Sequence, residues 1–478
     1  MSKILHISQR YWPALGGAEL FVKTIAEHNL NQGHEVEVWT TDADDPDSLW
    51  DSGRKKFEIQ ENEIVDGMRV RRFKVSNFIT DIPMINKGIR YILSHIPNWK
   101  LQVISFPPYI PDMYKEINSK ELDYDIIHVS CMPYSSIHYV AMEIARKCNA
   151  KLYMTPFQHV GVKGNYSAED KYYHPRVVPF FNRADKVFVQ TQAEYDEILN
   201  YMKKYQGYRT YNSLVIDNIL NQQVLLVDNI SIVYKIAAYL NSYIMKGLAL
   251  IFKIIDSIFG KKIKIDFDES KLELVGLGIY PKEVSGGNGD RFRKEWNISK
   301  DEKIIFYVGA RTSVKGVFNL IKAFEQVLKK EDDIRLVLAG PTTSEFENFY
   351  NSVPKDVKAK VILINGILDQ KKRDLFDAGD VFSMVSKSDS FGIVYLESWI
   401  NNKPVISSDI EAMKYVVDDG IDGYRVNFDD IDTIAKTIIK LLKDSELRNK
   451  LGSNGYEKVM KKYTWDIKFK ILDKYFNE

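Results

Sequence analysis

The sequence predicts an α/β protein built from two parallel sheets, each covered by helices on both faces. Short apolar runs typical of buried strands alternate with stretches whose apolar residues recur at helical spacing. This alternation occurs in two series, separated by a loose, polar stretch around 286–289. The length of 478 residues also exceeds what one hydrophobic core usually covers. We therefore expect two domains, each with a parallel sheet, because strands that alternate with helices pair in parallel.

The first series begins with a strand, a turn and a helix. Ile4, Leu5 and Ile7 form a short apolar run, and Gly16-Gly17-Ala18-Glu19 then opens a stretch with apolar residues at helical spacing. Further strands are predicted at 36–39, 126–129, 152–154 and 187–189. These elements define a predicted N-terminal domain over residues 1–280.

The second series predicts a C-terminal domain over 281–462, followed by a last helix over 463–478. Helices are predicted at 316–329 and 394–400. The predicted strands are 304–308, 336–339, 361–364, 381–384 and 404–407. In such sheets ligands bind beyond the carboxyl ends of the strands, so the loops that follow strands are the first places to look for function.

A segment of about 205–265 fits neither series and reads as a helical insertion in the N-terminal domain. Its pattern is apolar, and at 100° per residue Lys235, Ser242, Lys246 and Lys253 fall on one narrow stripe. No uncharged run reaches the roughly 18 residues of a spanning helix. Two interpretations stay open: an insertion packed on its own domain or on a second subunit, or peripheral contact of 231–262 with a membrane interface.

Composition excludes several classes of protein. Sixty-six Lys and Arg against 65 Asp and Glu give a net charge of +1, so no global field attracts nucleic acid or a membrane. The two cysteines, Cys131 and Cys148, are too few to stabilise a chain of this size by disulfides, and no signal pattern opens the chain. We expect a cytoplasmic protein, with attachment at most to the inner face of the membrane. Any anion site must be local.

One local anion site is predicted after the strand at 304–308. Arg311 and Lys315 lie in the loop between this strand and a helix that starts at Gly316. Two cations beside the free amides of a helix N-terminus suit a diphosphate. The pattern is not a Walker P-loop, because Lys315 precedes Gly316 and Val317 follows.

A second junction between a strand and a helix carries two carboxylates. Asp389 falls in the predicted loop and Glu397 inside the helix that follows, with seven residues between them. A carboxylate one turn into a helix, beside a nucleotide, can accept hydrogen bonds from both ribose hydroxyls. Asp389, with the amides of Gly392 and Ile393, is placed to meet a sugar and its phosphate.

Three other kinds of site fit the sequence less well. A glycosidase would also use two carboxylates, but it has no use for a phosphate site. A dinucleotide oxidoreductase needs Gly-x-Gly-x-x-Gly after the first strand, which Gly16-Gly17-Ala18 does not supply. An Asp-x-Asp metal motif occurs at Asp42-Ala43-Asp44, but it follows a strand of the other domain, so we predict no metal site.

Together these stretches resemble the retaining glycosyltransferases of family 4, which have the two-domain GT-B fold. The family's mark is an acidic residue, seven residues and a Glu, and here Asp389 stands where the family has Glu. The resemblance covers nearly the whole chain apart from the insertion. It also rests on the following stretches, in family order: Gly16-Gly17-Ala18-Glu19, Met154-Thr-Pro-Phe-Gln-His159, Ala184-Asp185, Gly276-Leu-Gly278, Leu338-Ala-Gly340-Pro341 and Trp465-Asp466.

The resemblance implies transfer of a sugar from a UDP- or GDP-linked donor, with retention of configuration, without a cofactor and without a metal. Arg311 and Lys315 would neutralise the diphosphate, Glu397 would hold the ribose, and His159 would approach the sugar. The implied catalytic residues are His159, Arg311, Lys315 and Asp389. The implied donor-binding residues are Gly16, Gly17, Arg311, Lys315, Gly366, Ile367, Asp389, Ser390, Phe391, Gly392, Ile393, Val394 and Glu397.

The acceptor expected from this resemblance is a glycan or a polyprenyl-linked saccharide, in cell-envelope or exopolysaccharide synthesis. No nucleic-acid partner is expected. A rival function from another class is a GT-B shell that has lost activity and serves in binding or assembly. It is motivated by Asp389, by the family's Asp missing from the Gly276-Leu-Gly278 element and by the insertion. A sugar-nucleotide epimerase on the same fold is a further alternative.

Overall fold

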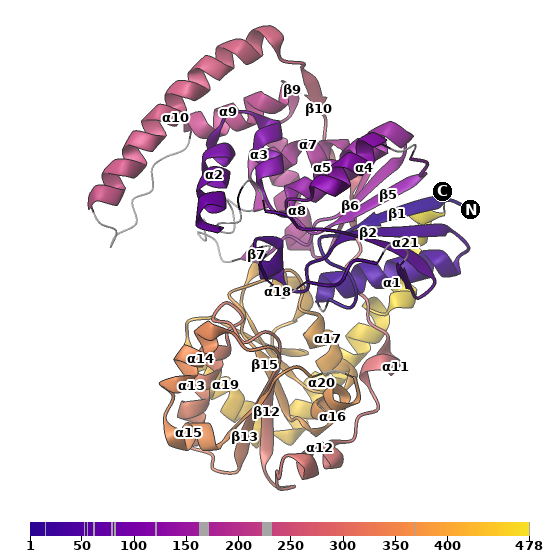
Figure 1. Cartoon of the computed structure of the whole chain (residues 1–478). Coiled ribbons are helices and arrows are strands. Elements are labelled where there is room, and N and C mark those ends of the chain that lie inside the picture. The colour runs from indigo at the N-terminus through magenta and orange to yellow at the C-terminus, as the bar shows by residue number, and fades with distance from the viewer. Residues whose placement is uncertain are drawn as a thin grey trace.

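The computed structural model describes residues 1–477 apart from 15, 52, 55, 61–62, 78–79, 81–82, 120–121, 162–171, 222–231 and 368. Within these residues two sheets form two α/β domains, one above the other in Figure 1. The first sheet has the strand order β11-β8-β6-β5-β1-β2-β4-β3, and all its neighbours are parallel except β3 and β4. Its strands are β1 (Lys3–Ile7), β2 (Glu35–Thr41), β3 (Glu63–Val65), β4 (Met68–Phe73), β5 (Ile126–Ser130), β6 (Lys151–Thr155), β8 (Lys186–Val189) and β11 (Leu272–Leu274).

Helices cover both faces of the first sheet because each presents an apolar stripe to it. In α5, for example, Ile137, Val140, Ala141 and Ile144 recur at helical spacing and all are buried. The helices and short 3-10 turns of this domain are α1 (Gly17–Asn31), η1 (Pro46–Leu49), α2 (Pro83–His95), α3 (Trp99–Ser105), α4 (Pro111–Ser119), α5 (Ser135–Cys148), η2 (Pro175–Val177), α7 (Val178–Arg183), α8 (Gln192–Lys203) and η3 (Glu269–Lys271).

The second sheet is parallel throughout, with the strand order β14-β13-β12-β15-β17-β18. Its strands are β12 (Lys303–Val308), β13 (Ile334–Ala339), β14 (Val361–Ile364), β15 (Val381–Met384), β17 (Val405–Ser408) and β18 (Gly423–Val426). The helices of this part are α11 (Pro281–Val284), α12 (Gly289–Glu295), α13 (Val317–Leu328), α14 (Ser344–Asn351), α15 (Lys355–Ala359), α16 (Asp369–Ala378), α17 (Ile393–Ile400), α18 (Glu411–Val416), α19 (Ile431–Lys443) and α20 (Ser445–Lys462).

The polar stretch between the two series is packed rather than loose. A side chain at Gly287 would meet the carbonyl oxygen of Arg373 at 2.1 Å, and one at Gly289 would meet the backbone of Ala378 at 2.9 Å. Both contacts are with α16, so the glycines here allow a close approach to the second domain. The glycines of this polar stretch therefore allow tight packing on α16, at the point where the chain passes from one domain to the other.

The last helix, α21 (Trp465–Phe476), crosses back and packs against the first domain. Trp465 lies 5.6 Å from Phe21 of α1 between ring centroids, and the hydroxyl of Tyr153 donates a hydrogen bond to the carbonyl of Tyr475 at 3.0 Å. Phe476 is buried beside Tyr153. In consequence the two chain ends lie side by side at the edge of the first domain (Figure 1).

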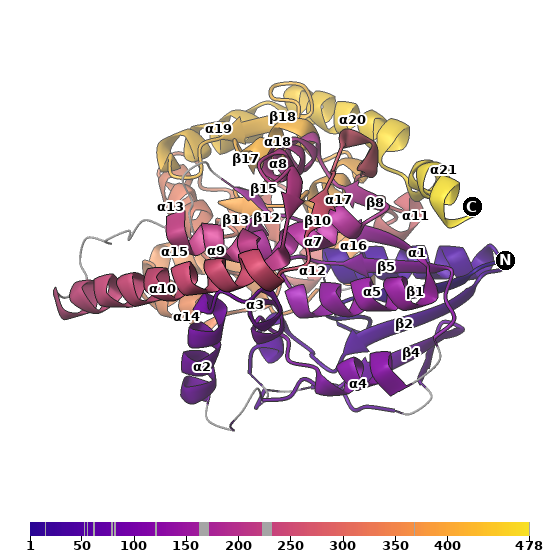
Figure 2. The same cartoon turned by 90° about the horizontal axis from the view of Figure 1, so that it is seen from above.

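The insertion consists of β9 (Gly207–Arg209), α9 (Tyr211–Asn221), α10 (Ile232–Phe259) and β10 (Ile263–Ile265). Antiparallel pairing of β9 with β10 closes its base, and α10 projects from the body of the domain (Figures 1 and 2). Residues 222–231 and the side chains of 232–241, including that of Lys235, lie outside the described part of the chain. Among the described helices none has the length and apolarity needed to span a bilayer.

Candidate active site

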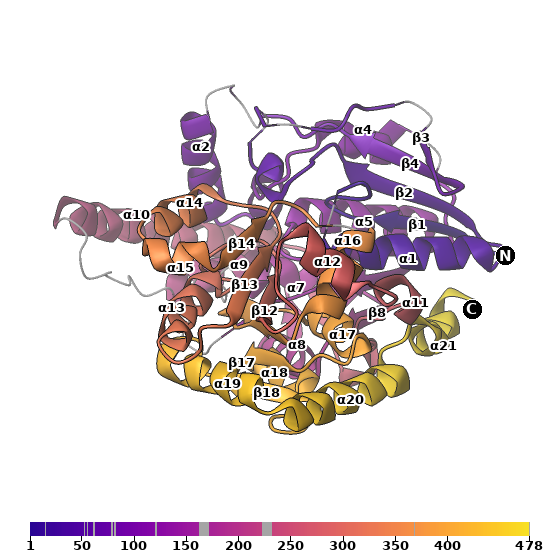
Figure 3. The ribbon, with the colours of Figure 1, turned by 90° about the horizontal axis from the view of Figure 1, so that it is seen from below.

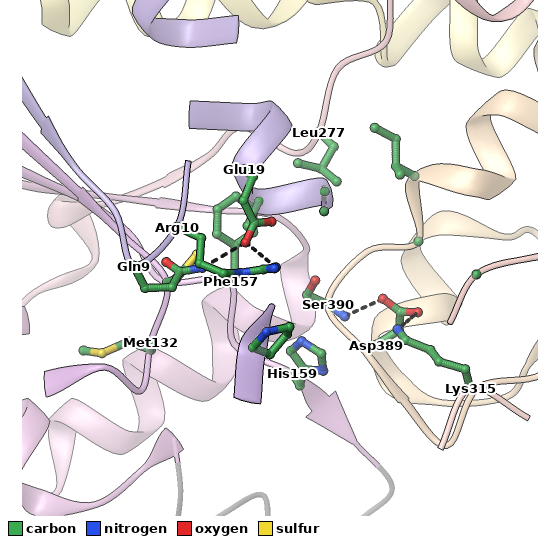
Figure 4. A pocket seen from close by; sticks show the side chains of 18 of the residues that line it. Gln9, Arg10, Glu19, Met132, Phe157, His159, Leu277, Lys315, Asp389 and Ser390 are labelled. Carbon is green, nitrogen blue, oxygen red and sulfur yellow. Dashed lines mark hydrogen bonds and ion pairs between the residues drawn. The ribbon is translucent and has the colours of Figure 1, made fainter. Parts of the chain in front are cut away.

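A cavity of about 450 Å³ lies between the two domains, and residues of both line it. The first domain contributes the start of α1 and the ends of β5 and β6, while the second contributes the loops after β12 and β15. Figure 4 shows His159, Arg10 and Glu19 on one wall and Lys315, Asp389 and Ser390 on the other. The cavity is therefore at the carboxyl ends of both sheets, where ligands of such sheets bind.

A short sheet across the domain boundary brings His159 to Asp389. Strand β7 (Val160–Gly161) of the first domain pairs antiparallel with β16 (Ser388–Asp389) of the second, and Asp389 is opposite Val160. Asp389 is thus in a two-residue strand, where the sequence predicted a loop. The ring of His159 stacks on Tyr172 at 5.6 Å between centroids and lines the cavity.

Lys315 and Asp389 form an ion pair on the wall of the second domain, with 2.8 Å between Nζ and Oδ2. Burial of Asp389 favours its neutral form, but the positive charges of Lys315 and His159 and hydrogen bonds from Lys315 and the Phe391 backbone outweigh burial. The pKa of Asp389 therefore lies below its ordinary value, and this carboxylate is charged at neutral pH.

The loop that carries Lys315 is fixed by a close approach of two backbones. Gly316 has a φ of 77°, and a β-carbon there would lie 1.8 Å from the carbonyl oxygen of Val385, just after β15. Only glycine fits both the left-handed conformation and this contact. The approach holds the loops after β12 and β15 together, and with them Lys315 and Asp389.

The start of α17 supplies backbone N–H groups to the cavity. Gly392, in the left-handed conformation, is the N-cap, and Gly392, Ile393 and Val394 line the cavity with Ser390. The Ser390 N–H donates to Oδ1 of Asp389 at 2.9 Å. The first N–H groups of a helix have no acceptor within it and carry a partial positive charge, so this end of α17 suits an anion.

Glu397 lies inside α17 and does not line the cavity itself. Its Oε1 accepts a hydrogen bond from Nζ of Lys372 in α16 at 2.6 Å, while Oε2 is buried and has no partner among the described residues. A buried carboxylate oxygen without a donor is costly.

Arg311 lies behind the cavity wall, with only 1% of its surface exposed. One Nη donates to Oδ1 of Asn365, and the guanidinium lies 5.0 Å from the centre of the Phe346 ring. Burial lowers the pKa of Arg311 below its ordinary value, and Nε and the other Nη have no partner among the described residues. Arg311 thus contacts the loop that contains Gly366 and Ile367. Four predicted site residues therefore do not line the cavity: Arg311, Gly366, Ile367 and Phe391.

The wall of the first domain contains Gln9 and Arg10, which no sequence motif predicted, beside Glu19 of the Gly16-Gly17-Ala18-Glu19 stretch. An Nη of Arg10 lies 2.6 Å from Oε1 of Glu19, and the other donates to the carbonyl of Asp44 at 2.9 Å. Gln9 lies beside them. Gln9 and Arg10 closely follow β1, so the rule that ligands bind after strands could have identified them. Gly17, next along the wall, has open space where a side chain would be.

Two residues of this wall have strained backbones. Cys131 and Phe157, which follow β5 and β6, have φ values of 70° and 51° and line the cavity. Non-glycine residues with such angles gather at functional sites, where the surrounding structure holds them. Sequence patterns carry no signal for this.

The Asp42-Ala43-Asp44 motif has a structural role in the first domain. Oδ1 of Asp42 accepts a hydrogen bond from the Val75 N–H at 2.9 Å. Among the described residues, no group of three His, Cys, Asp or Glu side chains could hold a metal ion.

Two family models match the chain. The model described as "Glycosyl transferase 4-like domain" matches residues 16–203, and the model described as "Glycosyl transferases group 1" matches 288–458. The two matches fall on the two sheets and leave out the insertion. The walls of the cavity belong mainly to these matched segments.

Several proteins with similar sequences are named glycosyltransferases. A 204-residue stretch is 28% identical to an uncharacterized glycosyltransferase of Methanocaldococcus jannaschii, covering 41% of this chain and 52% of that protein. Over 255 residues the chain is 26% identical to the capsular polysaccharide biosynthesis glycosyltransferase CapM of Staphylococcus aureus, covering 50% and 65%. The chain thus spans half to two thirds of the length of these relatives.

Solved structures share the whole architecture. The sucrose-phosphate synthase of Thermosynechococcus elongatus superposes with a TM-score of 0.64 at 18% identity, covering 99% of this chain and 98% of that one. Anabaena HepE in complex with UDP and glucose superposes with a TM-score of 0.62 at 15% identity, covering 99% of each chain. At these identities the likeness concerns the fold, which is GT-B.

Proposed function

The chain belongs to the glycosyl transferases of group 1, and from this we propose that it transfers a sugar from a nucleoside-diphosphate donor to an acceptor bound between its two domains. One observation carries the proposal. The Lys315–Asp389 pair and the start of α17 face His159 across the cavity between the domains. A cation and helix amides on one wall suit a diphosphate, and the cavity of about 450 Å³ between the walls leaves room for a sugar.

The leaving group determines what the site must stabilise. As the bond between sugar and diphosphate breaks, negative charge grows on the leaving oxygen. Lys315 and the amides of Gly392, Ile393 and Val394 would offset this charge without a metal. Arg311 would also contribute, by giving up its hydrogen bond to Asn365 and binding the diphosphate instead. Glu397 would accept hydrogen bonds from the ribose hydroxyls through Oε2, which has no partner among the described residues.

We further propose that the reaction retains configuration at the transferred sugar. The acceptor hydroxyl would attack on the face from which the diphosphate leaves, and its proton would pass to the leaving phosphate oxygen. No protein nucleophile is needed in this scheme. His159 and Asp389 would hold the donor sugar from opposite walls, since both line the cavity and the short β7–β16 sheet joins the two walls beside them.

The proposed acceptor is a glycan or a lipid-linked saccharide of the cell envelope or of an exopolysaccharide. Similar proteins support this class, among them CapM and a lipopolysaccharide 1,2-N-acetylglucosaminetransferase of Salmonella typhimurium, which is 26% identical over 214 residues. The acceptor would bind against Arg10 and Glu19. We propose a cytoplasmic reaction, and a UDP-linked donor is favoured because HepE was solved with UDP and glucose.

Thermal-shift measurements with UDP, GDP and their sugars, in the presence of EDTA, test the proposal. One nucleotide should stabilise the wild type by roughly 2–3 kcal/mol at about 100 times its dissociation constant. Glu397→Ala should lose most of this stabilisation, whereas Glu446→Ala, an exposed matched control on α20, should keep it. Absence of stabilisation by every nucleotide would contradict donor binding and favour an inactive shell. Binding without transfer or hydrolysis would contradict catalysis alone.

A further inference from the structure

Helix α10 of the insertion exposes an unusual number of large apolar side chains. Tyr243, Ile244, Leu250, Ile251, Ile254 and Ile258 are 72%, 60%, 56%, 56%, 64% and 66% exposed. Contiguous apolar surface of this extent on a protein that folds in water marks a site of interaction. The family match leaves this segment out, so the catalytic function does not explain it.

These side chains share one face, and it points away from the protein. The opposite face of α10 packs on α9, where Ala249, Met245 and Phe252 contact Ile216 and Ile219. At 100° per residue the six exposed apolar residues fall within about 120° of arc, centred opposite that contact. The packing on α9 fixes the rotation of the helix and therefore directs this face outward.

Hydrogen bonds at the base support the same orientation. The Asp256 carboxylate, which is buried, accepts hydrogen bonds from the Thr210 hydroxyl and, at 3.2 Å, from the Asn212 amide. In the described part of α10 this is the one acidic side chain, and it points toward α9. The outward face consequently carries no negative charge.

Positive charge borders the apolar face. Lys246 and Lys253 lie along one edge of it, with Lys253 bound to Asp217 at 3.2 Å, and exposed Lys261 and Lys262 follow the end of the helix. Residues 205–265 contain seven basic and three acidic residues, a net charge of +4, whereas the whole chain has +1. The insertion is thus the basic part of a protein that is otherwise slightly acidic.

We propose that α10 binds the surface of a membrane that contains anionic lipids, lying in the plane of the interface. Its apolar face would enter the boundary between headgroups and acyl chains, and the bordering lysines would meet the anionic headgroups. A second copy of the chain is a poorer partner, because pairing two such faces would bring the lysines that border one face close to those that border the other. Helix α2, which exposes Ile85, Tyr91 and Ile92, lies near α10 at the same end of the first domain (Figures 2 and 3).

Vesicle flotation of the full chain tests the proposal. The wild type should float with vesicles of phosphatidylcholine and phosphatidylglycerol, and less with pure phosphatidylcholine or at raised salt. Ile254→Glu combined with Ile258→Glu should lower the partition coefficient by at least about tenfold. The matched control is Ile64→Glu combined with Ile421→Glu, at positions 62% and 57% exposed outside the insertion, and it should float like the wild type.

A second pair of variants tests the charge. Lys261→Gln with Lys262→Gln should weaken flotation on anionic vesicles only, while Lys329→Gln with Lys330→Gln, exposed on the second domain, should have no effect. A wild type that stays unbound on both vesicle types would overturn the proposal. Equal flotation of the wild type and the Ile254/Ile258 variant would also overturn it, as would a dimer in light scattering that this variant abolishes while no vesicle binding occurs.

Discussion

At the scale of single residues, His159 shows how position and chemistry combine. Its backbone leads directly into β7, which pairs with the strand that contains Asp389, and its ring stacks on Tyr172. The residue before it, Gln158, donates its N–H to Oε1 of Glu194 at 2.7 Å. His159 is therefore held by a strand on one side and by a buried carboxylate on the other, as expected of a residue that orients a substrate.

His159→Ala should lower turnover by at least about tenfold and leave nucleotide affinity within about twofold of the wild type. The reason is that His159 would contact the transferred sugar and not the nucleotide. Steady-state kinetics gives the turnover, and titration calorimetry with the bare nucleotide gives the affinity. A wild-type rate would remove His159 from the site, and loss of nucleotide binding would show that its role is to shape the donor pocket.

Glu194 predicts a pH dependence of stability. Burial raises the pKa of this carboxyl from 4.5 to about 7, although the Gln158 and Gln190 N–H groups act in the opposite direction. Because the folded state binds the proton more tightly, the stability that this group contributes is complete below pH 4.5 and is lost as the pH rises through 7.

Glu194→Gln should remove this dependence. Between pH 4.5 and pH 7 the unfolding free energy of the wild type should fall, relative to that of the variant, by on the order of 3 kcal/mol. Urea unfolding at several pH values, followed by the fluorescence of the first domain, measures it. A difference that does not change with pH would contradict the account.

At the scale of elements, the site depends on loops that approach each other closely after parallel strands. The loops after β12 and β15 come together at Gly316 and Val385, and this contact sets Lys315 beside Asp389. The β7–β16 pairing then adds the first domain. The loops after β12 and β15 thus meet because neighbouring parallel strands direct their carboxyl ends to one edge of a sheet, and the third loop joins them from the other sheet.

Gly316→Ala should destabilise the second domain by at least about 2 kcal/mol and reduce donor binding. The new β-carbon would meet a backbone oxygen that cannot move aside. Gly420→Ala is the matched control, since Gly420 has a φ of 72° and open space around it, and it should cost only about 1 kcal/mol. Equal destabilisation by both variants would show that the left-handed backbone conformation alone explains the need for glycine at 316.

At the scale of the whole molecule, α21 ties the end of the second domain to the first. His28 of α1 stacks on Phe469 at 3.6 Å, and its Nε2 lies 2.7 Å from Oδ1 of Asp473. Phe476 packs against His6 of β1, His128 of β5 and Tyr153 of β6. The helix therefore links the two domains through α1 and the first sheet, in addition to the short β7–β16 sheet and the packing of α18 on α8.

Phe476→Ala should weaken this attachment by about 3–4 kcal/mol. Hydrogen exchange should then rise in α21 and in the part of α1 that contacts it, while protection of β12 and β13 should stay unchanged, because stability differs between cooperative units. Mass spectrometry of peptic fragments provides the measurement. A uniform rise across both domains would indicate that the two unfold as a single unit.

Sequence patterns predicted the α/β class, the two series of strands and helices and a separate helical insertion. Among the residues named as site candidates, Lys315, Asp389 and the glycines at 16, 17 and 392 line the cavity between the domains. These features are local: apolar spacing, glycine at loops and charge at the start of a helix all act within a few residues. They can therefore be recognised without knowing which strands are neighbours.

Only the tertiary structure decided which of these groups meet. It places His159 next to Asp389 through a sheet that joins residues more than two hundred positions apart, and it adds the Arg10–Glu19 pair to the opposite wall. It also turns Arg311 toward Asn365, behind the wall. Strand order, burial and the rotation of a helix depend on packing between distant segments, and no local pattern records them.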